Sequence, residues 1–102
     1  MNSTTIAKGY LIANYTIHDQ ATYDKYVAAA GILNSRFNLK PIVYDSNVEV
    51  KEGESGLVVA IAEFPSFEAA EQFYYSPEYQ AALQYRLAST TGSVILVRNI
   101  SI

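Results

Sequence analysis

The chain has no cysteine, no tryptophan and only one histidine among its 102 residues. Without cysteine it can form no disulfide, no thiolate nucleophile and no cysteine-ligated zinc or iron–sulfur site. The histidine, His18, has no second histidine or carboxylate cluster at ligand spacing, so no metal site is expected. Haem ligation by His18 has no motif support. Adjacent residues of a strand point to opposite faces, so Asp19 would not orient His18 as a catalytic base. We therefore interpret His18 as a solvated turn residue.

Positive charge is also scarce. The formal net charge is −3 with no Lys/Arg cluster, which argues against nucleic-acid binding. The longest apolar run, 57–62, is far too short to span a bilayer, and the first residues lack the pattern of a signal peptide. We therefore expect a cytoplasmic protein without a membrane partner. Dinucleotide, P-loop and nucleophile-elbow motifs are absent, so no cofactor is predicted.

Hydrophobic residues, in contrast, make up half of the chain, and nine residues are tyrosine. This composition and length fit one globular domain, which we place at 8–102 after a polar, disordered leader at 1–7. Strands are predicted at 9–17, 39–45, 56–64 and 93–100, with a brief further strand at 47–50 and a turn at 90–92. An amphipathic helix is predicted at 20–36, with an early end possible at Gly31.

The stretch from Phe64 to Arg86 contains two helix-start signals only ten residues apart, Ser66 and Ser76-Pro77. Proline disfavours helical geometry at the residue before it and is well suited to the first position of a helix. The sequence therefore predicts two short helices with a bend at Ser76. The first would carry Phe67 and Phe73 into the core.

The resulting order, βαββαβ, predicts a ferredoxin-like α+β fold with a four-stranded antiparallel sheet. The central strand would be 56–64, and Pro41 favours an edge position for 39–45. Both helical segments would lie on one face of the sheet, leaving the other face bare. Because monomers rarely expose such an apolar face, we expect a homodimer formed through the sheet faces.

The string EFPSFEAAEQFYYSPEYQAALQYR, with KGYLIANYTIHDQATYDKYV and NVEVKEGE, resembles the bacterial family of domain of unknown function 1330 in the dimeric α+β barrel superfamily. The resemblance covers nearly the whole chain and implies the fold and the dimer, but no activity. Two stretches depart from the family pattern, Tyr44-Asp45-Ser46 where an arginine and two glycines are common, and Phe73-Tyr74 where tryptophan is common. Any role of that arginine is not carried over.

Two charged residues are candidates for a site. Glu63 ends the most apolar strand, where burial could raise the pKa of its carboxyl for general acid or base catalysis; alternatively it is a hydrogen-bonded strand end. Arg86 lies seven residues after Tyr79, on the same helix face. It could bind a ligand carboxylate, or form a salt bridge with Glu63 or Glu78.

Uncharged polar side chains could complete an apolar pocket. The predicted ligand-binding residues are Tyr10, Asn14, Tyr44, Tyr74, Tyr75, Tyr79 and Arg86. Each tyrosine could equally serve the core or the dimer interface. Three functions stay open: binding of a small organic molecule, a cofactor-independent oxygenase or isomerase in which Glu63 or a tyrosine moves a proton, and a non-catalytic interaction module.

Overall fold

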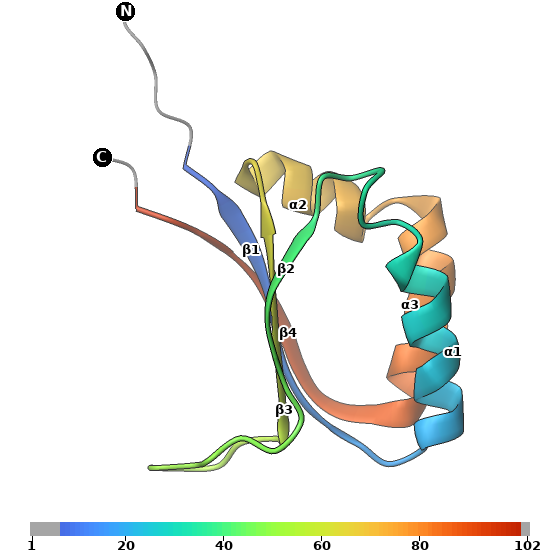
Figure 1. The fold of residues 1–102 in the computed structure, drawn as a ribbon, viewed down its shortest axis with the longest axis vertical. Helices are drawn as coiled ribbons and strands as arrows, with labels where there is room; N and C mark the ends of the chain where they lie inside the picture. Colours follow the sequence, from blue (N-terminus) through green and yellow to red (C-terminus); the bar gives the residue numbers. More distant parts are fainter. Residues whose placement is uncertain (1–6, 101–102) are drawn as a thin grey trace, which may run out of the picture.

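The computed structural model describes residues 7–100 and contains, over these residues, four strands and three helices (Figure 1). In chain order they are β1 (Gly9–Ile17), α1 (Gln20–Gly31), β2 (Lys40–Asp45), β3 (Val58–Phe64), α2 (Phe67–Tyr74), α3 (Pro77–Ser89) and β4 (Thr90–Arg98). The leader predicted at 1–7 lies outside the described residues except for Ala7.

The strands form one antiparallel sheet in the order β2-β3-β1-β4. Over residues 7–100, Figure 1 shows all three helices on the same side of this sheet, with no helix on the other side. This is the ferredoxin-like α+β fold that the sequence predicts. As predicted, β3 is an inner strand and β2, which contains Pro41, lies at an edge.

The alternation in β1 separates the two faces of the sheet. Leu11, Ala13 and Tyr15 are buried against the helices, whereas Tyr10 and Asn14 are only partly buried on the opposite side. We call that opposite side the open face. It comprises Tyr10, Ile12, Asn14 and Thr16 with the residues paired to them in β3 and β4.

The first helix begins where predicted and ends earlier than residue 36. Asp19 caps α1 by accepting a hydrogen bond from the backbone N–H of Thr22 at 3.2 Å. Gly31 is the last helical residue, and a turn follows in which Asn38 has a φ of 56°. Asparagine tolerates the left-handed conformation better than most residues, and Asn38 lies two residues before the start of β2.

Two local predictions were wrong. Residues 47–50 form no strand but belong to a loop that projects past the open face at one end of the sheet (Figure 1). Residues 90–92 form no turn, because β4 starts at Thr90, directly after α3. A side chain at Gly92 would place its Cβ 2.3 Å from the backbone oxygen of Asn14, so this glycine permits close approach of β4 to β1.

The double helix start is confirmed. The hydroxyl oxygen of Ser66 accepts a hydrogen bond from the N–H of Ala69 at 3.0 Å, and that of Ser76 accepts one from Tyr79 at 3.1 Å. Pro77 is the first residue of α3. The bend lets α2 cover one end of the sheet while α3 runs beside α1.

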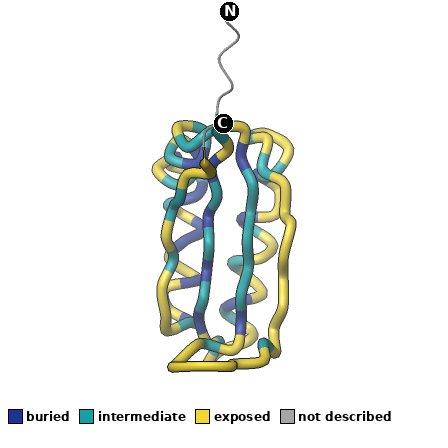
Figure 2. Tube along the Cα trace, turned by 90° about the vertical axis from the view of Figure 1, so that its left-hand side faces the viewer, coloured by how far each residue is buried: buried dark blue, intermediate teal, exposed yellow. Residues whose placement is uncertain are grey.

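The core lies between the sheet and the helices and is largely aromatic. Phe64 and Phe73 have ring centroids 5.3 Å apart, and Phe73 and Tyr79 are 4.4 Å apart. Figure 2 shows buried positions alternating along β1, whereas β3 is buried at its two ends and partly buried between them, and β2 is exposed along its whole length. The sheet is therefore well covered at its centre and poorly covered at this edge.

Candidate functional site

A cavity of about 240 Å³ lies between the helix-covered face of the sheet and α1. Small side chains form its floor, among them Ala13 of β1 and Ala60 of β3. Its rim includes Val27, Val43 and Tyr44, all substantially exposed. The cavity therefore opens to solvent between α1 and the edge strand β2.

Three tyrosines of the lining lie on the two elements that enclose this apolar floor: Tyr15 of β1, and Tyr23 and Tyr26 of α1. The hydroxyl groups of Tyr15 and Tyr23 share a buried hydrogen bond of 2.6 Å. Tyr26 shares one of 2.9 Å with Tyr79 of α3. These paired hydroxyls fix the ring positions, because both oxygens of each pair find a partner inside the protein.

All three rings remain neutral phenols at physiological pH. Burial raises the pKa of Tyr15 to about 12, even though the hydrogen bond with Tyr23 and the charge of Arg86 lower it. Burial also raises the pKa of Tyr23, and its hydrogen bond with Tyr15 adds to the effect. The pKa of Tyr26 is raised by burial and by its neighbour Tyr79. These groups can donate hydrogen bonds, but none is a base near neutral pH.

Arg86 lies beside these tyrosines and is only 5% exposed. Its guanidinium carbon is 5.7 Å from the ring centroids of both Tyr15 and Tyr26, a cation–π distance. Its buried Nε atom has no hydrogen-bond partner within residues 7–100. Neither salt bridge considered from the sequence forms, because Glu63 pairs with Lys8 and Glu78 pairs with Arg36.

Other predicted site residues lie on the open face, away from the cavity floor. The hydroxyl of Tyr10 donates a hydrogen bond to the carboxylate of Glu63 at 3.2 Å. The same carboxylate is 3.8 Å from the amine of Lys8, and Asn99 donates to the Tyr10 hydroxyl at 2.9 Å. Glu63 and Tyr10 thus form one cluster, separate from Arg86.

Asn14 holds the end of the β2–β3 loop. Its amide nitrogen donates to the carbonyl groups of Gly56 and Val58 at 3.2 and 3.1 Å and to the hydroxyl of Ser55 at 3.1 Å. Its amide oxygen accepts from the N–H of Gly56 at 3.3 Å. Asn14 is therefore hydrogen-bonded to this loop and is not one of the residues that line the cavity.

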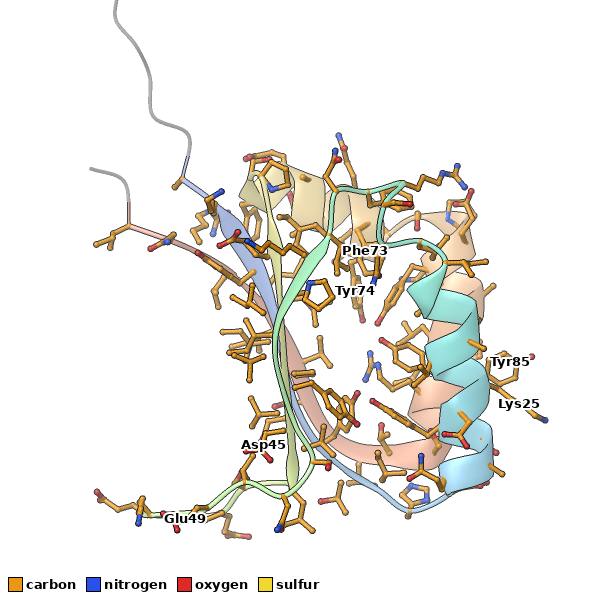
Figure 3. The ribbon with its side chains drawn as sticks, in the orientation of Figure 1. Lys25, Asp45, Glu49, Phe73, Tyr74 and Tyr85 are labelled. Carbon is orange, nitrogen blue, oxygen red and sulfur yellow. The ribbon has the colours of Figure 1, made fainter. Side chains whose placement is uncertain are left out.

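The remaining predicted tyrosines lie at different places. Tyr44 is on the cavity rim, and Tyr79 is buried beneath it through its bond to Tyr26. Tyr74 packs against the core and Tyr75 is 69% exposed. Figure 3 shows Phe73 between the sheet and the helices, whereas Tyr85 and Lys25 project from the helices away from the sheet.

The sequence did not single out Tyr15, Tyr23 and Tyr26, which line the cavity. Their spacing places them in the apolar repeats of a strand and a helix, so they read as core residues. A usable signal was their hydroxyl groups, since phenols on the buried faces of two consecutive elements need partners there. Periodicity alone does not show that a cavity lies next to them.

Within residues 7–100, no helix is long and apolar enough to cross a membrane. Over the same residues, no three histidine, aspartate or glutamate side chains are grouped as metal ligands would be.

Comparisons with known proteins agree with the fold. The family model described as "Domain of unknown function (DUF1330)" matches residues 8–100, whereas none of the curated proteins matches the sequence. A protein of unknown function from Rhodopseudomonas palustris is 18% identical with a TM-score of 0.71, over 99% of this chain and 88% of that one.

Two further solved structures share the fold. SnoaB, a cofactor-independent oxygenase from Streptomyces nogalater, is 14% identical with a TM-score of 0.64, over 94% of this chain and 96% of SnoaB. A dimeric protein of unknown function and ferredoxin-like fold from Bacteroides fragilis is 10% identical with a TM-score of 0.60, over 95% of this chain and all of that one. At these identities the likeness shows the fold alone.

Proposed function

We propose that this chain, which belongs to the DUF1330 family, binds a small organic molecule with an apolar ring in the cavity between α1 and the sheet. The observation that carries the proposal is the cavity itself. It has an apolar floor, a solvent-accessible rim and phenol donors fixed by mutual hydrogen bonds. Such a combination is typical of small-molecule sites.

The size of the cavity limits the ligand. A cavity of about 150 Å³ lined by apolar side chains can hold benzene, so about 240 Å³ suits a molecule of one to two rings. Aromatic side chains on α1 and β1 favour a flat ligand that contacts their faces or edges. A polar substituent on the ligand would be directed toward the tyrosine hydroxyls.

A second candidate is a cofactor-independent oxygenase, as SnoaB is described to be. In favour of it, the cavity has a largely apolar wall that would keep a reactive ring away from water, and its phenols can donate hydrogen bonds to an oxygen atom of the substrate. The carboxylate proposed as a proton acceptor, Glu63, belongs to the open face. On this chain the oxygenase hypothesis therefore depends on hydrogen-bond donation by the neutral tyrosines, which are not bases near neutral pH, rather than on proton transfer to Glu63.

We also propose that two copies associate through their open faces. Ile12, Ile61 and Ile95 lie side by side there in three adjacent strands, and Ile95 is 51% exposed. A contiguous apolar patch across a sheet is a surface that a second sheet would cover. The neighbour from Bacteroides fragilis is described as dimeric, which supports association of two copies but not a particular interface.

A ligand screen by thermal unfolding tests the binding proposal. The panel contains small phenols, naphthols, flavin and haem. A ligand at about 100 times its Kd adds about 2.7 kcal/mol to the free energy of unfolding, which raises Tm by about 10 °C or more in a domain of this size.

Two variants locate the site. Ala60→Leu places a larger side chain in the cavity floor and should abolish the shift, whereas Ala88→Leu, on the exposed side of α3, should retain it. Equal shifts in both variants would exclude this cavity, and a panel without any shift would favour the interaction module. Oxygen uptake and product analysis with each bound compound then separate a binder from an oxygenase.

Sedimentation equilibrium tests the dimer. Ile95→Lys places a charge in the open face and should convert a dimer into 11.3 kDa monomers. Leu87→Lys is the matched control, because Leu87 is 58% exposed on α3, which lies on the helical side. A wild-type chain that sediments as a monomer at micromolar concentration would overturn this proposal.

A further inference from the structure

Arg86 is a buried cation without an anionic partner among residues 7–100. The ion pairs found within residues 7–100 join Lys8 to Glu63, Arg36 to Glu78 and Lys51 to Glu49, and none of them involves Arg86. Its Nε atom also lacks a hydrogen-bond partner over those residues. A buried guanidinium that is neither paired nor fully hydrogen-bonded is costly, so proteins seldom keep one without a use for its charge.

The neighbours of Arg86 reduce this cost but leave its charge uncancelled. The rings of Tyr15 and Tyr26 both lie at cation–π distance from the guanidinium. Burial by itself lowers the pKa of Arg86, but Tyr79, Tyr26 and Tyr15 together outweigh it and raise that pKa above its ordinary value. The group is therefore cationic throughout the physiological range, and Tyr15 and Tyr26 beside it are neutral phenols.

The same two tyrosines connect Arg86 to the cavity. Tyr15 and Tyr26 both line the cavity, and Arg86 lies beside both rings. Among the described residues that line the cavity, there is no aspartate, glutamate, lysine, arginine or histidine. Arg86 is thus a positive charge close to an apolar space that has no carboxylate to offset it. The interaction between charges is stronger in such a space than in water.

We propose that the cavity selects a ring-bearing oxyanion, such as a phenolate, an enolate or an aromatic carboxylate, and that Arg86 stabilises its charge across the Tyr15 and Tyr26 rings. This inference rests on the binding proposed above and specifies its ligand class. Arg86 acts here as a positioning and electrostatic residue, since it contacts the lining tyrosines rather than the cavity space. The tyrosine hydroxyls, held as neutral donors, provide the hydrogen bonds that an oxyanion needs.

The test uses para-nitrophenol, whose neutral and ionised forms have different absorption spectra, and para-nitroanisole as a neutral analogue of similar shape. The pKa of the bound phenol is read from its spectrum during a pH titration of the wild-type protein. We expect it to fall by about one unit or more relative to water, as a unit charge within about 8 Å would produce at an effective dielectric of about 20. By the same linkage, the phenolate should then bind about tenfold or more tightly than the neutral phenol, which the anisole represents as an analogue that cannot ionise.

Three variants assign the effect to Arg86. Arg86→Met keeps much of the side-chain volume without the charge and should return the pKa of the bound phenol to its value in water or above it. Arg86→Lys should restore a large part of the shift. Arg36→Met removes the same charge from a side chain that is 60% exposed and should leave the shift unchanged.

The two proposals fail in different ways. If the wild-type protein binds both probes equally and the pKa of the phenol is unchanged, the oxyanion inference is overturned while the cavity remains a binding site. If neither probe nor any member of the thermal panel binds, the proposed function fails and this inference with it. Should Arg86→Met not fold, the wild-type titration alone still decides, because it requires no variant.

Discussion

Alkaline pH should destabilise this protein steeply, because two buried tyrosines, Tyr15 and Tyr23, and the partly buried Tyr26 keep their protons in the folded state. In the unfolded chain a tyrosine ionises at about pH 10, whereas burial raises the pKa of Tyr15 to about 12 and also raises those of Tyr23 and Tyr26. Between about pH 10 and the raised pKa values of the folded protein, the unfolded state binds fewer protons than the folded state. The free energy of unfolding must therefore fall as pH rises above about 10, and below that pH the full stability is present.

The size of the effect follows from the number of groups. Each retained proton lowers the free energy of unfolding by about 1.4 kcal/mol per pH unit. Tyr15 alone, with its pKa of about 12, accounts for about 3 kcal/mol in total. Tyr15 and Tyr23 share a hydrogen bond and titrate as a coupled pair, and Tyr26 adds a third group. Together they lower the stability by about 6 kcal/mol at about pH 11.5, a large part of the 5–15 kcal/mol typical of a domain.

Urea unfolding at a series of pH values from about 8 to 11.5 measures this slope, while phenolate absorbance counts the tyrosines that ionise before unfolding. Tyr23→Phe should reduce the slope by about one third, and Tyr85→Phe, a ring on the outside of the helices, is the matched control. A free energy of unfolding that stays constant between about pH 10 and 11.5 would refute the reasoning. So would ionisation of all nine tyrosines near pH 10 in the folded protein.

Three further substitutions test local features by urea unfolding. Gly9→Ala should cost about 1–3 kcal/mol, because its Cβ would lie 2.6 Å from the backbone of Phe67, whereas Gly31→Ala meets no atom within 4 Å and is the control; equal effects would contradict the close approach. Ser76→Ala should cost about 1–2 kcal/mol by removing the cap of α3, and an unchanged midpoint would show that the cap is dispensable. Asn14→Ala should cost about 1–3 kcal/mol and expose the β2–β3 loop to trypsin; wild-type cleavage rates would show that the loop is held by other contacts.

Local chemistry made much of the secondary structure predictable. The alternation in β1 and the serine caps of α2 and α3 each depend on a few adjacent residues, and all appear where the sequence places them. The strand predicted at 47–50 and the turn at 90–92 failed because pairing is not a local property. Residues 47–50 have β propensity but gain no partner strand, and Gly92 serves the approach of β4 to β1.

The candidate site was less accessible to sequence reasoning. Arg86 was a candidate site residue from the sequence, and the structure shows that its side chain is buried. The paired hydroxyls of Tyr15 and Tyr23 did not stand out, because a tyrosine in an apolar repeat looks the same whether it fills a core or borders a cavity. Glu63 and Asn14 proved to belong to clusters on the open face.

The sequence by itself determined the order of the elements, the bend between the two helices and the ferredoxin-like fold, since these follow from periodicity, caps and proline. Only the tertiary structure decided which tyrosines meet, where the cavity opens and that Arg86 has no carboxylate partner among residues 7–100. The physical reason is that a cavity and an unpaired charge depend on distances between residues far apart in the chain. Those distances are set by how the helices pack on the sheet, a property that no single segment encodes.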